Sequence, residues 1–137
     1  MFLTRIIYVS KYKPLDQLND LKNIKNCASV YNAKHGITGT LALGDDYFIQ
    51  CIEGGRREVN NLYNKIVTDS RHSDVMVIEC TEIHSRHFAD WTMECMLITK
   101  EKEKIIKKFS RNESFNPYEM TALSAIGFLL EMNKVQL

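Results

Sequence analysis

The sequence predicts an α+β fold in which a five-stranded sheet carries two helices on one face and a C-terminal helical hairpin on the other. Two observations lead to this prediction. Segments with strand-like alternation and segments with helical spacing follow one another in the order β-α-β-β-α-β-β. The first strand is apolar on both faces, so each side of the sheet needs a covering layer. The length of 137 residues fits one domain with at most a helical extension.

The chain begins with a predicted strand and a long predicted helix. Residues 3–10 mix β-branched, aromatic and aliphatic side chains in an extended pattern. Pro14 follows at a position typical of the first helical turn. Gly36 then marks the end of the helix. The apolar residues between these two points recur at helical spacing and are Leu15, Leu18, Leu21, Ile24, Ala28 and Tyr31.

A hairpin and a second helix come next. Residues 37–43 and 47–53 read as two strands joined by the turn at residues 44–46. Beyond Gly54 and Gly55 the spacing becomes helical, with an apolar stripe formed by Val59, Leu62, Tyr63, Ile66 and Val67. Residues 71–74 end this helix, and residues 75–83 and 91–98 are predicted as two further strands. The resulting order contains the split βαβ unit of a ferredoxin-like sheet.

The last part of the chain is predicted to form two helices. Residues 104–109 suggest a short helix. Asn116, Pro117 and Glu119 are typical of an N-cap, a first helical residue and a capping-box glutamate at the start of a longer helix. We expect residues 1–98 to form one domain and residues 99–137 a C-terminal helical extension.

The first strand indicates where this extension packs. Ile6 and Tyr8 share one face, while Ile7 and Val9 lie on the other. We therefore expect the C-terminal helices to cover the face opposite the first two helices.

Composition and charge exclude several classes of protein. Hydrophobic residues make up 45% of the chain and charged residues 26%, so a packed core is expected rather than disorder. The net charge of +1 supplies no basic field for nucleic acid or an anionic membrane. Neither a signal peptide nor a stretch of transmembrane length is evident, which favours a cytoplasmic protein. No CxxC pair occurs, and we expect buried free thiols at Cys27, Cys51, Cys80 and Cys95.

Three polar residues on otherwise apolar faces are the candidates for function. Gln50 lies between Phe48 and Ile52 on one face of its strand, and Tyr8 shares a face with Ile6. Each has an ordinary alternative: a glutamine satisfied by neighbouring backbone and a core tyrosine with a bonded hydroxyl. For Asn32, at the end of the first helix, a capping role is favoured. Together, however, they would leave donors and acceptors unsatisfied unless a polar guest, such as a heteroaromatic ring, lay between helices and sheet.

Other chemistries have little support in the sequence. His84 and His87 lie in a predicted loop without the i, i+4 spacing of a helical metal clamp. Asp69 and Glu53 are single carboxylates that read as solvated charges. None of the motifs GxSxG, Walker A or GxGxxG occurs, so triad hydrolysis, P-loop phosphoryl transfer and dinucleotide binding of the Rossmann type are not indicated.

The chain resembles the BLUF domains, which are blue-light sensors that use FAD. The segments that carry the resemblance run in the family's order over about the first hundred residues. They are residues 5–10, Asn32 with residues 36–39, residues 48–54, residues 69–72, residues 86–88 and residues 91–93.

The resemblance implies a non-covalent FAD between the two sheet-facing helices, with Asn32 bonded to the edge of its ring. It also implies that, after absorption of blue light, Tyr8 passes an electron and a proton to the flavin and that their return leaves Gln50 rearranged. Either rotation or tautomerisation of the Gln50 amide accounts for this change. The cofactor-binding residues expected from the family are Tyr8, Ser10, Ile24, Asn32, Gln50, Lys65, Asp69, Arg71 and His72.

Trp91 and Met93 are the candidates for relaying the change at Gln50, and we expect them to share one face of the last strand. The C-terminal helices are the expected two-state element. Two positions depart from common family forms: Tyr31 replaces a polar residue, and Lys65 stands where arginine is frequent. Cys51 points away from Gln50 and is expected to be inert.

The expected function is that of a photoreceptor without enzymatic turnover. Because residues 99–137 leave no room for an attached output domain, we expect the signal to reach a separate protein, without direct contact with nucleic acid or membrane. A homo-oligomer is compatible with this interpretation. The alternatives are a small ferredoxin-like flavin-dependent oxidoreductase or oxygenase and a structural oligomer without a cofactor.

Overall fold

The computed structural model describes residues 2–13, 17–44, 46–110 and 114–135. Pro14, Leu15 and Asp45, which the sequence analysis assigned to the start of a helix and to a turn, lie outside the described residues.

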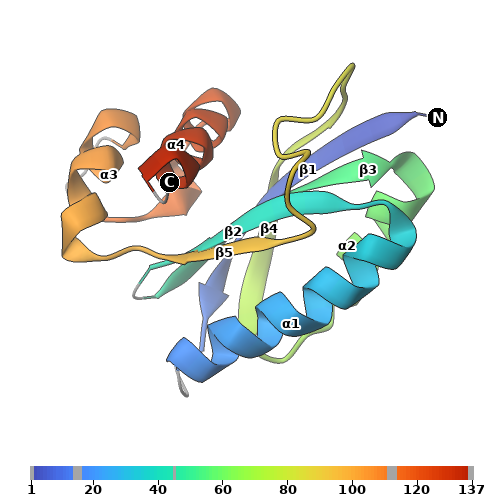
Figure 1. Cartoon of the computed structure of the whole chain (residues 1–137). Helices are drawn as coiled ribbons and strands as arrows, with labels where there is room; N and C mark the ends of the chain where they lie inside the picture. The colour runs from blue at the N-terminus through green and yellow to red at the C-terminus, as the bar shows by residue number, and fades with distance from the viewer. Residues whose placement is uncertain (1, 14–16, 45, 111–113, 136–137) are drawn as a thin grey trace.

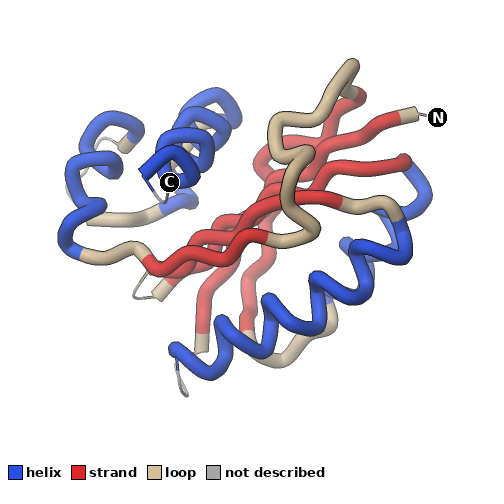
Figure 2. The backbone as a smooth tube through the Cα atoms, in the orientation of Figure 1, coloured by secondary structure: helices blue, strands red, loops and turns tan. Residues whose placement is uncertain are grey.

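A five-stranded sheet forms the centre of the molecule (Figures 1 and 2). Its strands lie side by side in the order β4-β1-β3-β2-β5, and all neighbours are antiparallel except the parallel pair β2 and β5. The predicted order of elements and the α+β, ferredoxin-like arrangement are confirmed. The strands are β1 (Leu3–Tyr12), β2 (Thr38–Leu43), β3 (Tyr47–Gly55), β4 (His72–Glu82) and β5 (Glu94–Leu97).

Two helical layers enclose the sheet. Helices α1 (Gln17–His35) and α2 (Arg56–Val67) cover one face, and α3 (Glu103–Phe109) and α4 (Ala122–Val135) cover the other (Figure 1). Short 3-10 turns, η1 (Lys100–Lys102) and η2 (Pro117–Glu119), precede the last two helices. We call the two sides the helix face and the tail face. As predicted, successive residues of β1 and β3 serve the two faces alternately.

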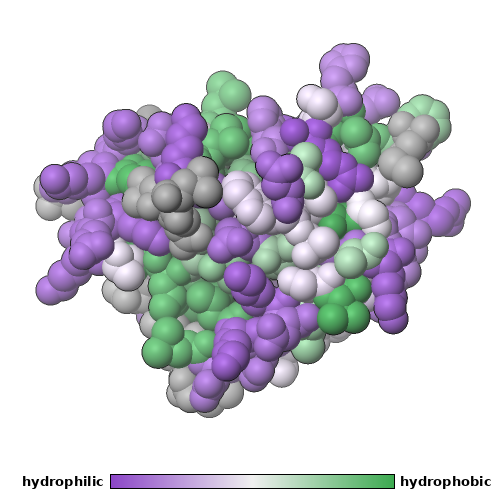
Figure 3. All heavy atoms as spheres, in the orientation of Figure 1, coloured by the Kyte–Doolittle hydropathy of each residue, from purple (hydrophilic) through white to green (hydrophobic). Residues whose placement is uncertain are grey.

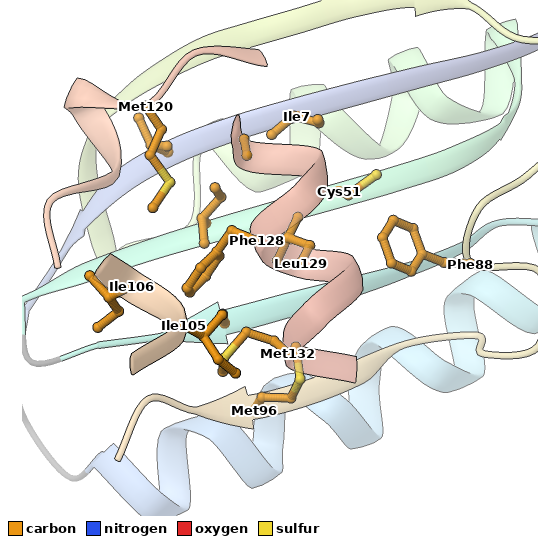
Figure 4. Close-up of a cluster of buried hydrophobic side chains, with 14 residues drawn as sticks. Ile7, Cys51, Phe88, Met96, Ile105, Ile106, Met120, Phe128, Leu129 and Met132 are labelled. Carbon is orange, nitrogen blue, oxygen red and sulfur yellow. The ribbon is translucent and has the colours of Figure 1, made fainter. Parts of the chain in front are cut away.

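Each face has its own apolar cluster. The helix-face cluster contains Ile6, Tyr12, Leu21, Ile37, Leu41, Leu43, Phe48, Ile52, Val59 and Met93. The tail-face cluster contains Ile7, Val9, Ala42, Ile49, Cys51, Phe88, Met96, Ile105, Ile106, Met120, Ala125, Phe128, Leu129 and Met132, and Figure 4 shows α4 packed onto β1 and β3 through this cluster. Fully burying a large apolar side chain contributes about 1.5–3 kcal/mol, so the tail-face cluster holds α3 and α4 firmly on the sheet.

The last strand differs from its prediction. It comprises only residues Glu94–Leu97, so Trp91 and Met93 precede it in a loop. Met93 is buried in the helix-face cluster, whereas Trp91 packs against the tail-face cluster. The expectation that these two residues share one face of a strand is therefore wrong. The chain crosses from one face to the other between them.

The predicted helix start at Asn116 is also corrected. The Asn116 side chain does act as a cap, accepting a hydrogen bond from the backbone N–H of Tyr118, but it caps only the 3-10 turn η2. Helix α4 begins six residues later, at Ala122, and just before it Thr121 Oγ1 accepts the N–H of Ser124 at 3.1 Å. A proline at the first position of a turn is equally suited to a 3-10 and an α-helical turn, which explains the error.

The cysteines are all free, as expected, but they are not all buried. Cys51 lies in the tail-face cluster with no exposed surface, Cys95 is half-buried, and Cys27 and Cys80 are exposed.

Figure 3 shows a largely hydrophilic surface with hydrophobic side chains gathered between α1 and the tail helices.

Candidate functional site

A cavity of about 200 Å³ opens between the helix face of the sheet and the helices α1 and α2. Its walls are mainly apolar, with Leu41 and Phe48 from the sheet, Ile24 and Ala28 from α1 and Leu62 from α2. Polar groups from β1, β3, α1, α2 and residues 69–72 converge on the same space. Such an apolar cavity with a few placed polar groups is the usual form of a small-molecule site.

Tyr8 and Gln50 lie at the floor of the cavity. They are direct cross-strand neighbours in the register of β1 and β3, so both side chains leave the sheet on the same face. The Tyr8 hydroxyl donates a hydrogen bond to Gln50 Oε1. The Gln50 amide in turn directs Nε2 at Met93 Sδ, at 3.5 Å. Tyr8, Gln50 and Met93 are all buried, so this line of three side chains is shielded from water.

Burial also controls the ionisation of Tyr8. Loss of solvation raises the pKa of its phenol well above the ordinary value, and the negative charge of Asp69 adds to the effect. The ring meets Tyr63 and His72 edge to face, with centroids 6.1 and 6.0 Å away. Tyr8 is therefore a neutral phenol held in one orientation by its neighbours.

Asn32 presents an unsatisfied acceptor at the cavity. Its Nδ2 donates to the carbonyl of Thr92 at 2.6 Å, but its Oδ1 is buried without a hydrogen-bond partner in the described part of the chain. The capping role favoured for the Asn32 side chain is wrong, because the side chain bonds to Thr92 and α1 ends at His35, followed by Gly36 in the left-handed region with φ of 64°. An orphaned buried acceptor costs about 1–3 kcal/mol, so a ligand with a ring N–H fits this position.

Charged side chains lie at the α2 end of the cavity. Arg71 donates to the Asp69 carboxylate, and this hydrogen bond holds the pKa of Asp69 below its usual value. Lys65 Nζ lies 4.3 Å from the centroid of the Tyr31 ring. Both Lys65 and Arg71 can meet an anionic group of a ligand at this end.

Most of the predicted cofactor-binding residues line this one cavity. They are Tyr8, Ile24, Asn32, Gln50, Lys65, Asp69, Arg71 and His72, together with Met93. Ser10 does not line the cavity but contacts His72, which does, with Ser10 Oγ 2.9 Å from His72 Nδ1. On the other side of the ring, His72 Nε2 lies 2.6 Å from the carbonyl oxygen of Ile66. Trp91 is not among the lining residues. Its side chain packs on the tail face.

Several residues that line the cavity were not predicted from the sequence. Cys27 lies on α1 between Ile24 and Tyr31, and Ile66 belongs to the predicted stripe of α2. Helical spacing alone could have found both, since residues three or four apart share a face.

Glu53 is the clearest error among the candidate residues. It was interpreted as a solvated charge, yet its side chain has no exposed surface. It accepts hydrogen bonds from Arg5 on β1 and from the backbone of His87 and Phe88. These partners are distant in sequence, so no local pattern revealed them.

Groups of candidate metal ligands and membrane-spanning helices are absent from the part of the chain that the structure describes. No group of three His, Cys, Asp or Glu side chains there could hold a metal ion. No described helix is both long and apolar enough to cross a bilayer.

The fold and the cavity together define a small α+β binding domain for a flat heteroaromatic ligand. The sequence pattern of the family described as sensors of blue-light using FAD matches residues 3–94, and the chain belongs to this BLUF family. FAD is the cofactor by which the family is defined.

Relatives with curated functions support the same assignment. The photoactivated adenylate cyclase subunit beta of Euglena longa is 39% identical over 93 residues, which are 66% of this chain but 11% of that protein. The blue light- and temperature-regulated antirepressor BluF of Escherichia coli strain K12 is 27% identical over 92 residues, which are 67% of this chain and 23% of that protein. The chain thus matches only a small part of each of these relatives.

Solved structures of similar length match nearly the whole chain. The photo-activated state of BlsA has a TM-score of 0.86 at 29% identity and covers 95% of this chain and 94% of that one. The dark state of BlrB, a BLUF protein, has a TM-score of 0.82 at 26% identity and covers 99% and 98%. The similarity therefore extends over the helices that follow the sheet.

The residues present fit a flavin. The apolar walls suit the faces of a planar ring, the orphaned Asn32 Oδ1 suits a ring N–H, and Lys65 with Arg71 suits the negatively charged end of FAD. The cavity thus offers groups that match the flavin ring and the phosphates of the cofactor.

Proposed function

We propose that this chain is a blue-light photoreceptor whose switch is the hydrogen bond between Tyr8 and Gln50. The observation that carries the proposal is the buried line Tyr8–Gln50–Met93 in the cavity of a BLUF domain. Bound FAD supplies the light absorption and the oxidising power, as cofactors generally supply the difficult chemistry. The chain supplies orientation, shielding from water and a movable proton.

Tyr8 is the proposed donor of an electron and a proton. Its hydroxyl is protonated over the physiological pH range, because burial raises its pKa. The proton lies in a hydrogen bond to Gln50 Oε1. If Tyr8 gives the electron and the proton to FAD and later recovers both, Gln50 meets a different set of donors and acceptors during the interval.

Gln50 is the proposed two-state group. An amide offers an acceptor on one side and a donor on the other, so rotation or tautomerisation exchanges what it presents to Tyr8, Met93 and the flavin edge. Its burial supports the idea that the new arrangement persists, since water cannot readily supply substitute hydrogen bonds.

The tail helices are the proposed output element. Next to Met93, the carbonyl of Glu94 accepts a hydrogen bond from Thr40 Oγ1 at 3.2 Å. Asn133 of α4 donates from Nδ2 to the same Thr40 oxygen at 3.3 Å. A displacement of Met93 therefore has a short route to α4. Within this proposal, residues 1–98 are the flavin-binding domain and residues 99–137 are the extension that contacts a separate partner protein without enzymatic turnover.

Absorption spectroscopy tests the proposal directly. The purified chain, loaded with FAD, is expected to show a reversible red shift of the flavin bands after blue light, and Gln50→Leu is expected to abolish the shift while retaining the cofactor. A chain that binds FAD without any light-induced shift would exclude the sensor. Flavin turnover with substrate consumption in darkness would favour the oxidoreductase instead.

A further inference from the structure

Glu53 is the most completely buried charged group of the described chain, and it lies outside the cavity. It sits three residues beyond Gln50 on β3 and therefore on the opposite, tail face of the sheet. A buried carboxylate is stable only where charged or N–H donors surround it. The position of those donors indicates what Glu53 holds in place.

The donors come from β1 and from the loop that precedes β5. Arg5 Nε lies 3.0 Å from Glu53 Oε2. The backbone N–H groups of His87 and Phe88 donate to Oε1 at 3.0 and 2.9 Å. The carboxylate thus fastens residues 87 and 88 to the centre of the sheet. Phe88 itself is fully buried in the tail-face cluster near Leu129 of α4 (Figure 4).

Arg86 strengthens the same attachment from the other side. Its guanidinium donates to the carbonyls of Gly36 at 2.7 Å and Glu53 at 3.2 Å, and to Thr38 Oγ1 at 2.9 Å. Residues 86–88 are therefore attached to the sheet in two ways, by the Glu53 carboxylate and by the Arg86 guanidinium.

The loop is held a second time just before Met93. The carbonyl of Trp91 accepts the N–H of Gly39 at 3.0 Å, and the carbonyl of Thr92 accepts Asn32 Nδ2 at 2.6 Å. Between these two attachments the chain passes from the tail face to the helix face. The segment is thus attached to the fold at residues 86–88 and again at residues 91 and 92, and Met93 Sδ lies beside Gln50 Nε2 directly after the second attachment.

We propose that Glu53 is a positioning residue for the switch, acting through the loop of residues 86–93 to hold Met93 against the Gln50 amide. This inference rests on the proposed function, and it adds a residue on the far face of the sheet that touches neither the cavity nor Gln50. The carboxylate acts by fixing backbone, so its loss loosens the loop and frees the amide from its sulfur partner.

The test compares Glu53→Gln with a matched control, Glu79→Gln, in the FAD-loaded full chain. The control removes the second carboxylate partner of Arg5, at 3.3 Å, but leaves every contact between Glu53 and the loop. In darkness, Glu53→Gln is expected to speed hydrogen exchange at the amides of residues 87 and 88 by about tenfold or more, the effect of losing a charge-assisted hydrogen bond. The side-chain amide NMR signal of Gln50 is expected to move, and Glu79→Gln is expected to change neither.

The light cycle then tests positioning rather than mere stability. Glu53→Gln is expected to change the rate of dark recovery by about tenfold. It is expected to have no further effect in a Met93→Leu background, because both substitutions remove the same contact. Additive effects, or an unchanged Gln50 signal despite faster exchange, would overturn the inference. If Glu53→Gln does not fold, Arg86→Ala loosens the same loop and is judged by the same results.

Failure of the proposed function is distinguishable from failure of this inference. If the unaltered chain shows no light-induced shift, the photoreceptor proposal falls. The dark NMR signal of Gln50 still responds to Glu53→Gln if the carboxylate positions Met93, and stays unchanged if it does not.

Discussion

The Tyr8 hydroxyl is the atom on which the proposed switch depends. It donates to Gln50 Oε1, while the ring packs edge-on against Tyr63 and His72. Tyr8→Phe removes only the hydroxyl, so the chain is expected to retain FAD and to lose the red shift. Absorption spectra before and after blue light check this. Tyr63→Phe is the control and is expected to keep the shift; a normal shift in Tyr8→Phe would remove Tyr8 from the mechanism.

The raised pKa of Tyr8 leads to a second prediction. A phenol whose pKa is higher in the folded state stabilises the fold below its unfolded value of about 10 and loses that contribution only as the pH rises further. The light-induced shift is therefore expected to keep its size between about pH 6 and pH 9. A titration of the shift over this range checks it, and a midpoint within the range would show that Tyr8 is not the buried neutral donor.

Single residues also show what could be predicted from sequence. Alternation along a strand correctly placed Tyr8 and Gln50 on one face, because the side-chain period of a strand is fixed. The partners of Glu53 and Asn32 could not be foreseen in this way. Glu53 bonds to His87 and Phe88, which lie 34 and 35 positions further along the chain. Asn32 bonds to the carbonyl of a residue that lies 60 positions further along. Such contacts are set by tertiary packing and leave no local pattern.

At the level of elements, the close packing of α3 against α4 makes a testable site. A Cβ added at Gly127 of α4 would lie 2.5 Å from the Phe109 ring of α3. Alanine is favoured over glycine in a helix by about 1 kcal/mol, but overpacking costs about 1–3 kcal/mol, so Gly127→Ala is expected to destabilise the chain by up to about 2 kcal/mol. Urea unfolding measures this change. Leu123→Ala, on the same helix with 85% of its side chain exposed, is the control and is expected to have little effect. A more stable Gly127→Ala would show that the ring moves aside freely.

The elements that were predicted less well are the irregular ones. The long strands and helices follow from strong periodicity, whereas residues 91–93 were predicted as the start of a strand that runs to residue 98. Their side chains instead cover both faces of the sheet in turn. A strand of four residues is too short for alternation to define its limits, and pairing with β2 decides where it begins.

The whole molecule depends on the tail helices to cover one face of its sheet. Ile7, Ile49 and Met96 lose their cover if the chain is truncated after Ile98. We expect this truncated chain to aggregate, because an apolar sheet face of this kind is a site of association. Size-exclusion chromatography with light scattering checks this. A monomeric chain of residues 1–98 with a normal light-induced shift would show that the tail is needed neither for folding nor for the switch.

FAD is expected to cover apolar surface on the helix face, as the tail helices cover apolar surface on the tail face. Without a ligand, Asn32 Oδ1 has no partner among the described residues, and the cavity walls expose apolar surface. Binding to the folded chain alone stabilises it by about 2.7 kcal/mol at a hundredfold excess of FAD over its dissociation constant. For a chain of this size, removal of FAD is therefore expected to lower the melting temperature by about 10 °C. Thermal unfolding followed by circular dichroism measures the difference. Adenosine monophosphate, which lacks the flavin ring, is the control and is expected to restore only a small part of it; equal stabilisation by both ligands would show that contacts to the flavin ring do not stabilise the chain.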